Sequence, residues 1–343
     1  MLCLATGVAG GLARMGVAAS AAPAGAVAGH GALMVVGFLA TLIGLERAVA
    51  LARPWAYAAP AATGLGALAE LALGPHWSGG SLALLGSVVL TAVMATALWR
   101  FRTPWLALQT AGALALAVGT ARFALGAPIA LALPWWTAFP LLTIAGERLE
   151  LSRVAAPPPA AMRALLALGV GLIAASAASF AAPRAATREM GALWLAIALW
   201  LLRYDLARRS LRRAGVPRFM AVSLLSGYAW LALAGAGALA AGLPAAGPIT
   251  DAVLHAFFLG FVFAMIFGHA PVIFPAVLGL PMGFSRRFYL HLGLLHAGIA
   301  VRIAGDLLGW PALRQAGGVA NALALLLFFA QTAGAVQAGR RRD

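Results

Sequence analysis

The sequence is poor in charged residues and has almost no cysteine. Charged residues make up 10% of the 343 residues, lysine is absent, and Cys3 is the single cysteine. Soluble globular proteins have about 25% charged residues, so this composition excludes a soluble enzyme. One cysteine excludes a disulfide framework and a Cys-x-x-Cys metal or redox motif. The chain is instead 63% hydrophobic, which indicates a multi-pass helical membrane protein with the lipid bilayer as its first partner.

Apolar runs long enough to cross a membrane recur along the chain. We count about twelve between residues 2 and 335, each of roughly 17–25 residues, the length that spans about 30 Å of hydrocarbon. The first run, 2–20, is weak because it contains Arg14. We therefore expect an all-α integral membrane bundle of about twelve transmembrane helices that forms a single domain, residues 1–343.

The Pro-rich loop at 157–159 is the place where that domain would divide into halves, 1–150 and 160–343. No connection in the chain is long enough to fold alone. A short sequence feature is repeated along the chain, since the Glu-Arg pairs at 46–47 and 147–148 each end an apolar run. Such pairs at a membrane boundary are expected to form ion pairs that fix helix ends.

The basic residues predict the orientation of the bundle. All 24 are arginines, and 18 of them fall in alternate loops or at the C-terminus. Short arginine-rich loops stay cytoplasmic, so we expect both termini on the cytoplasmic side of the inner membrane. Six arginines fall on the opposite side: Arg14, Arg122, Arg184, Arg188, Arg302 and Arg314. The net charge of +15 therefore reflects orientation and contact with anionic lipid, and no nucleic-acid partner is expected.

The histidines provide the main functional information. His30 and His255 lie at the outer ends of the second and tenth runs, and His269 follows about 21 Å deeper on nearly the same helix face as His255. His291, in the eleventh run, matches the depth of His269. An imidazole at membrane depth is costly without a partner, so these are candidate functional residues. We expect a cofactor pair, His30 with His255, and a metal pair, His269 with His291.

Other polar residues at membrane depth are candidates for supporting the ligands or relaying protons. Asp251 lies one turn before His255, where it either orients that ring or caps the helix. Glu70 is the one acid well inside an apolar run. Arg302 and His296 complete this group. No acid-rich cluster is present, which argues against a di-iron carboxylate centre.

Paired imidazoles favour particular cofactors. Two neutral imidazoles from facing helices can hold a haem iron, and the porphyrin suits the apolar interior of a bundle. Imidazole also suits copper. We therefore expect haem as the cofactor, with copper as a further candidate.

Two segments carry a family resemblance. The first reads His-x-x-x-Met-x-x-Gly-Phe from His30, and the second reads His-Ala-x(3)-Gly-x(4)-Met-Ile-x-Gly from His255. Both resemble the signature segments of NnrS-type membrane proteins and, more distantly, of haem–copper oxidase subunit I. The resemblance implies a many-spanning bundle associated with haem, copper and the response to nitric oxide. It also implies that His30 and His255 are the ligands.

Three functions are open at this point. The leading one is a haem-binding redox or nitric-oxide-related membrane protein, with a small gas such as nitric oxide or dioxygen reaching the iron through lipid. Whether the protein turns over a substrate is left open. The second is a proton-coupled transporter or channel that uses the buried ionisable residues. The third is a structural assembly factor in which histidines only form hydrogen bonds between helices.

Overall fold

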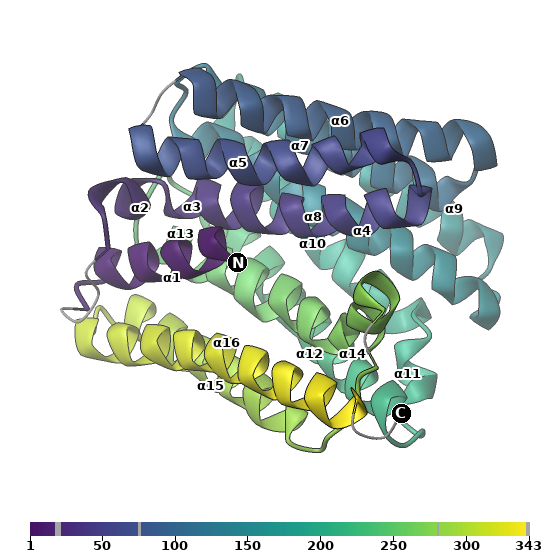
Figure 1. Ribbon diagram of the computed structural model, residues 1–343. Coiled ribbons are helices and arrows are strands. Elements are labelled where there is room, and N and C mark those ends of the chain that lie inside the picture. Colours follow the sequence, from purple (N-terminus) through teal and green to yellow (C-terminus); the bar gives the residue numbers. More distant parts are fainter. Residues whose placement is uncertain (18–21, 75–76, 280, 341–343) are drawn as a thin grey trace. The chain divides into compact units, whose positions relative to one another are not determined.

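The computed structural model describes residues 1–17, 22–74, 77–279 and 281–340, and every regular element within these ranges is a helix (Figure 1). The predicted all-α class is confirmed. The elements are, in chain order, α1 (Leu2–Arg14), α2 (Ala24–Ala28), α3 (His30–Ala32), η1 (Leu33–Ala40), α4 (Thr41–Leu51), η2 (Pro54–Tyr57), α5 (Ala58–Leu73), α6 (Trp77–Phe101), α7 (Pro104–Ala124), α8 (Ile129–Ser152), η3 (Arg153–Ala155), α9 (Pro159–Ala178), α10 (Pro183–Tyr204), α11 (Ala207–Ser210), α12 (Val216–Ala241), α13 (Pro248–His255), η4 (Ala256–Phe263), α14 (Ala264–Leu278), α15 (Phe288–Leu307) and α16 (Pro311–Arg340).

Eleven helical segments among the described residues are long and apolar enough to cross a membrane. One of them, Pro248–Val277, joins α13, η4 and α14 without a break. The difference from the predicted twelve lies at the N-terminus. Within the described part of this run, residues 2–17, the one helix is the 13-residue α1, which is about 20 Å long and shorter than about 30 Å of hydrocarbon. It ends at Arg14 because Gly16 follows with a left-handed φ of 80°, a conformation that commonly terminates helices.

The chain forms two compact units. Unit 1 is Met1–Glu150 with Pro158–Met190, and unit 2 is Leu151–Pro157 with Gly191–Asp343. Helix α9 belongs to unit 1, where it packs on α7. The units therefore do not coincide with the halves 1–150 and 160–343.

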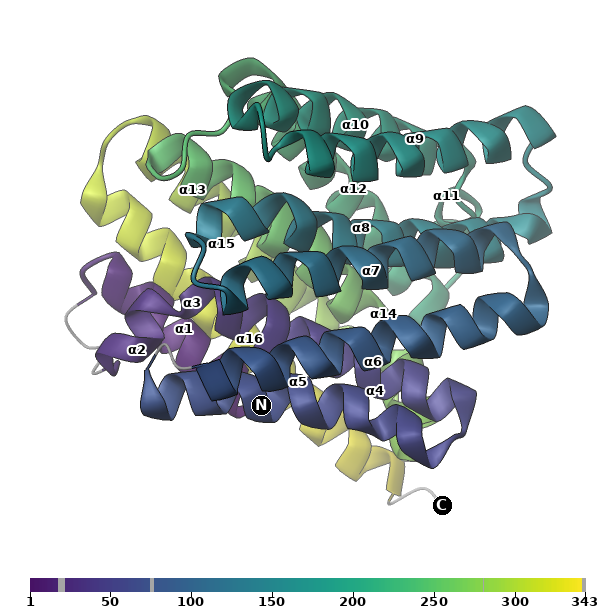
Figure 2. The same ribbon diagram turned by 90° about the horizontal axis from the view of Figure 1, so that it is seen from above.

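In unit 1, α5, α6 and α7 lie side by side (Figures 1 and 2). Glycines let the first two of these helices approach backbone to backbone. A Cβ added to Gly66 would lie 2.5 Å from the backbone nitrogen of Ala83, and one added to Gly86 would lie 2.5 Å from that of Thr63. Small residues at such contacts are typical of helix pairs in membranes, where close van der Waals packing holds the pair together.

In unit 2, α15 and α16 form a hairpin with the same register of glycines. A Cβ added to Gly305 would lie 2.3 Å from the backbone nitrogen of Arg314, and one added to Gly317 would lie 2.3 Å from that of Arg302. In both hairpins the two tight contacts are three residues apart on each helix. Matching these contacts places Arg302 and Arg314 of unit 2 at the positions of Thr63 and Ala83 of unit 1.

A histidine and a π-helix precede each hairpin. His30 opens α3, which runs directly into the eight-residue π-helix η1. His255 ends α13, which runs directly into the eight-residue π-helix η4. Such wide helical turns are rare and occur frequently at functional sites. The two units thus share a histidine, a π-helix and a glycine-packed hairpin in the same chain order.

The Glu-Arg pairs noted in the sequence meet within unit 1. Arg47 on α4 forms an ion pair with Glu147 on α8, and its guanidinium also lies 3.8 Å from Glu46. The expected ion pair at the helix ends is therefore present, and it joins two helices that are 100 residues apart in the chain.

We expect Gly317→Ala to destabilise the protein, because the new Cβ would press on the backbone of α15. Overpacking of this kind costs about 1–3 kcal/mol, which should lower the melting temperature in detergent by several degrees. Gly334→Ala on the same helix is the matched control, since nothing lies within 4 Å of its Cβ position. Equal effects of the two substitutions would show that the hairpin is not close-packed at Gly317.

Candidate functional site

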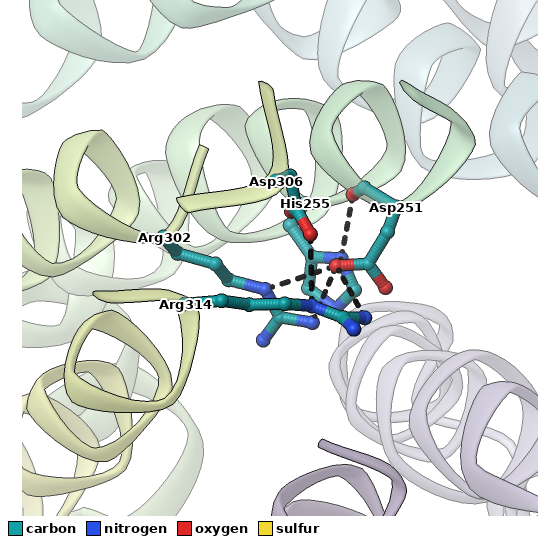
Figure 3. A network of polar contacts seen from close by, with 5 residues as sticks. All are labelled: Asp251, His255, Arg302, Asp306 and Arg314. Carbon is teal, nitrogen blue, oxygen red and sulfur yellow. Dashed lines mark hydrogen bonds and ion pairs between the residues drawn. The ribbon is translucent and has the colours of Figure 1, made fainter. Parts of the chain in front are cut away.

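Five charged or titratable side chains of unit 2 form one network, in which three of them contact the carboxylate of Asp251 (Figure 3). Asp251 on α13 accepts hydrogen bonds from Arg302 on α15, at 2.8 Å from Nη2 and 3.2 Å from Nε. Arg314 on α16 places Nη2 3.4 Å from the same oxygen of Asp251. Arg314 also forms an ion pair with Asp306, at 2.8 Å. The imidazole Nδ1 of His255 lies 3.4 Å from the Asp251 carboxylate.

The network is buried at Asp306 and Arg302 and partly exposed at Arg314, and it contains two arginines and two aspartates. The Asp306 side chain is fully buried and that of Arg302 is 8% exposed. A buried charge is stable only with a close partner of opposite sign, and here two arginines face two aspartates. The network ties together α13, α15 and α16, so these three helices hold their relative positions through it.

Of the two interpretations of Asp251, the geometry favours the one in which it orients His255. Helix α13 begins after Gly247 and has no side-chain cap. The His255 Nδ1 donates a 2.8 Å hydrogen bond to the backbone carbonyl of Asp251, while the carboxylate of the same residue faces the ring. Asp251 therefore holds the imidazole through its backbone and its side chain together.

In unit 1, His30 is held in a comparable way by α1. Its Nδ1 donates a 2.7 Å hydrogen bond to the backbone carbonyl of Gly7. The ring lies against Gly11, where an added Cβ would come within 2.8 Å of the ring carbon Cε1. The short helix α1 thus supplies both a hydrogen-bond acceptor and a flat surface for this imidazole.

His269 makes the third bond of this type. Its Nδ1 donates a 2.8 Å hydrogen bond to the carbonyl of Met265, one turn earlier on α14. A carbonyl oxygen only accepts, so Nδ1 carries the proton in His30, His255 and His269. In a neutral imidazole the lone pair is then on Nε2, the state in which that nitrogen coordinates metals.

The structure does not bring His269 and His291 to one face. The ring of His291 packs at 4.8 Å against Phe267, and His269 follows Phe267 by two residues, about 200° around α14. His291 Nδ1 instead bonds Gln331 of α16 at 2.8 Å. Across the described ranges, no group of three or more His, Cys, Asp or Glu residues is arranged to hold a metal ion. The arrangement therefore does not favour the expected metal pair.

His296 is a bonded interior residue. Trp230 donates to its Nδ1 at 3.0 Å, and its Nε2 donates to the Ser226 hydroxyl at 2.8 Å. Both ring nitrogens are used in packing α15 against α12. This geometry gives His296 no place in the network around Asp251.

The remaining predicted residues are divided between the units. His30 and Glu70 belong to unit 1, and His255 and Arg302 belong to unit 2. The pairing of His30 with His255 stays a prediction. Glu70, on α5, lines a cavity of unit 1.

Sequence reasoning missed two members of the network, Asp306 and Arg314. Asp306 follows Arg302 by four residues, so the two lie on one face of α15. Arg302 and Arg314 were also two of the six arginines that fell outside the arginine-rich loops. Asp251 and Asp306 lie at the same end of neighbouring helices as these two arginines. That placement was the indication in the sequence that the arginines have partners inside the protein.

The fold and these sites define a class: an all-helical protein whose membrane-length helices surround bonded histidines and a buried ion network. The chain belongs to the family described as Domain of unknown function (DUF8744), whose profile matches residues 1–337. The comparison with curated proteins finds no match. The resemblance to NnrS-type proteins stays a prediction.

We expect a strong energetic coupling between Asp251 and Arg302. Either Asp251→Asn or Arg302→Met alone leaves a buried charge short of its partner and should cost about 3 kcal/mol. The double variant should cost clearly less than the sum of the two. Unfolding of the four proteins of this cycle in detergent measures the coupling.

Arg287→Met is the control for the loss of an arginine, because Arg287 is exposed at the start of α15. It should leave stability unchanged. Additive effects of Asp251→Asn and Arg302→Met would contradict the network as described.

Proposed function

We propose that this protein is a multi-pass membrane protein that binds haem, with Nε2 of His30 and Nε2 of His255 as iron ligands. The observation that carries the proposal is the hydrogen bond from Nδ1 of each ring to a backbone carbonyl. Histidines that bind metals almost always donate their other ring N–H in this way, because the bond fixes the tautomer and the ring orientation.

The surroundings of the two histidines support the same use. Each lies within one turn before a π-helix, a geometry that is frequent at functional sites. Gly11 leaves a flat surface beside the His30 ring. Asp251 faces the His255 ring with a carboxylate, which makes an imidazole a better electron donor to a metal. His269 has the same tautomer and is a further candidate ligand.

Bound haem would supply an iron that takes up small gases and changes oxidation state. The residues of the chain would orient the ligands and exclude water. Gly7 and Asp251 hold the two imidazoles in the ligating tautomer, and the apolar helices keep water away. Nitric oxide or dioxygen would arrive through lipid. Imidazole also suits copper, so copper stays a further candidate cofactor.

The orientation in the membrane belongs to the same proposal. The arginine-rich loops and the C-terminus would face the cytoplasm, with the bundle in the cytoplasmic membrane. His30 and His255 would then lie toward the outer surface. Eleven crossings would place the two ends of the chain on opposite sides of the membrane. A cytoplasmic N-terminus would therefore require α1 to cross as a twelfth helix, and α1 is only about 20 Å long.

Variants of the two histidines test the haem proposal. Expressed with added haem and purified in detergent, the protein should show a Soret band, and His30→Ala or His255→Ala should reduce the haem-to-protein ratio about tenfold or more. Added imidazole should restore the spectrum of either variant, because it replaces a lost ligand but does not repair a packing defect.

His296→Ala is the matched control, since both nitrogens of that ring serve packing. It should leave the haem content unchanged. A purified protein without a Soret band, or ligand variants with the unaltered spectrum, would refute the proposal.

The buried network favours a second candidate function, a proton-coupled transporter or channel. Clusters of ionisable groups at membrane depth commonly carry proton movement. In liposomes containing a pH-sensitive dye, the protein would then speed proton entry under an imposed pH gradient, and Asp251→Asn would abolish that effect. An entry rate equal to that of empty liposomes would exclude this function.

A further inference from the structure

The connection between α10 and α12 in unit 2 is densely basic. Six arginines lie between residues 203 and 218, and all six are exposed: Arg203, Arg208, Arg209, Arg212, Arg213 and Arg218. Asp205 is the one acid in this stretch of sequence. None of the six arginines forms an ion pair with a residue that the structure describes. Like charges this close together repel one another, so an anion from outside the chain would stabilise the array.

Asp205 fixes the backbone of this connection. Its buried carboxylate accepts a 2.6 Å hydrogen bond from the backbone N–H of Ala207, the first residue of α11. It also accepts a 3.2 Å hydrogen bond from the hydroxyl of Tyr228 on α12. The short helix α11 packs on α12 as well. The arginines on and after α11 are therefore presented from a positioned backbone, while the acid that positions it lies below the surface.

Aromatic packing brings a second pair of arginines to the same face. Phe219 directly follows Arg218 at the start of α12, and its ring lies 5.7 Å from that of Phe288 at the start of α15, measured between centroids. Arg286 and Arg287 directly precede Phe288, and both are exposed. No acid lies within five residues of this pair in the sequence. Two segments that are far apart in the chain thus form one surface of eight arginines, the arginine surface.

The arginine surface borders exposed apolar side chains. Leu199 lies one turn before Arg203 on α10 and is 55% exposed, and Leu290 lies three residues after Arg287 on α15 and is 60% exposed. Leu211, among the arginines themselves, is 39% exposed. Because α10, α12 and α15 are long and apolar enough to cross a membrane, a phosphate bound at the arginines would leave acyl chains beside these leucines. A soluble polyanion would make no use of them.

We infer that the arginine surface binds an anionic phospholipid with two phosphates, of the cardiolipin type. One phosphate lies at the arginines of 208–213 and the other at Arg218, Arg286 and Arg287, with the acyl chains against the exposed leucines. A planar guanidinium binds phosphate through two parallel N–H bonds, which suits arginine to this use. Clusters of about four to eight basic residues beside a membrane helix are typical of anionic-lipid recognition. This inference does not depend on haem.

Competition between lipids tests the inference. Full-length protein in dodecyl maltoside is incubated with fluorescent cardiolipin, which is displaced by unlabelled cardiolipin, phosphatidylglycerol or phosphatidylcholine. These lipids carry two phosphates, one anionic phosphate and a zwitterionic head group, respectively. Cardiolipin should displace the label at a concentration about tenfold or more below that needed for phosphatidylcholine, with phosphatidylglycerol between them. Equal displacement by cardiolipin and phosphatidylcholine would overturn the inference.

Two double variants test whether both segments contribute to one site. Arg208→Gln with Arg209→Gln, and Arg286→Gln with Arg287→Gln, should each weaken cardiolipin binding about tenfold or more. The reason is that each arginine near an anionic lipid contributes about fivefold to the affinity. Unchanged cardiolipin affinity in either double variant would contradict a site that spans the two segments.

Arg184→Gln with Arg188→Gln is the matched control for the loss of two positive charges. Both arginines are exposed near the start of α10, at the opposite end of that helix from Arg203. This double variant should bind cardiolipin as the unmodified protein does. An equal loss of affinity in the control would show that the lipid responds only to total charge, which would overturn the inference.

Asp205→Ala separates a positioned site from general charge attraction. The substitution adds one net positive charge to the connection and removes the hydrogen bonds that hold α11. General attraction predicts equal or tighter binding of cardiolipin, whereas the positioned surface predicts binding that is weaker by about fivefold or more. Melting temperatures show whether the variant is folded, and the variants of exposed arginines test the site without this requirement. Tighter binding by folded Asp205→Ala would contradict the inference.

Inorganic pyrophosphate distinguishes a lipid from a soluble anion. It carries two linked phosphates and no acyl chain, so it lacks the contacts to the exposed leucines. It should displace the label only at concentrations about a hundredfold or more above that of cardiolipin. Displacement by pyrophosphate and cardiolipin at similar concentrations would assign the surface to a soluble anion and overturn the lipid inference.

Discussion

Polar groups among apolar helices must find their partners inside the protein, and this requirement accounts for most of the site geometry. His30, His255 and His269 each donate Nδ1–H to a backbone carbonyl. Arg302 and Arg314 meet the carboxylates of Asp251 and Asp306. An unpartnered group in such surroundings costs several kcal/mol, roughly the whole stability margin of a small domain. Each of these contacts also joins or stiffens helices, so the partners that satisfy the polar groups determine the packing as well.

The need for hydrogen-bond partners distinguishes histidines that look equivalent in the sequence. His296 uses both ring nitrogens on α12, so its role is packing. His30 and His255 use Nδ1 on a carbonyl, which leaves Nε2 as the nitrogen with the lone pair. The haem proposal depends on that distinction, and it would have no structural basis if all the buried rings were bonded as His296 is.

Composition and hydrophobic runs were enough to predict the helical class and nearly all the membrane-length helices, because length and hydropathy are local properties. The first run was predicted too long, since the left-handed Gly16 ends α1. The network around Asp251 was missed because its members come from three helices, and their contacts depend on how those helices pack. The special positions of His30 and His255 were visible in the sequence, but the carbonyl of Gly7 could not be foreseen as a partner.

The two units use one plan in two ways. Each has a histidine, a π-helix and a glycine-packed hairpin. Unit 2 adds a salt-bridge network beside its histidine, and unit 1 has small residues and a cavity in the corresponding region. Unit 2 has the large side chain of Arg314 where unit 1 has Ala83, so the same packing scheme leaves a charged network in one unit and a cavity in the other.

The tautomers of His30 and His255 are the most direct measure of this account. Nitrogen NMR of protein labelled with 15N-histidine and prepared without haem distinguishes a protonated from an unprotonated ring nitrogen, and single-histidine substitutions assign the peaks. The account predicts a protonated Nδ1 and an unprotonated Nε2 at both residues, with the Nε2 signals lost or strongly shifted when haem is added. A protonated Nε2 at either residue, or Nε2 signals that do not respond to haem, would contradict it.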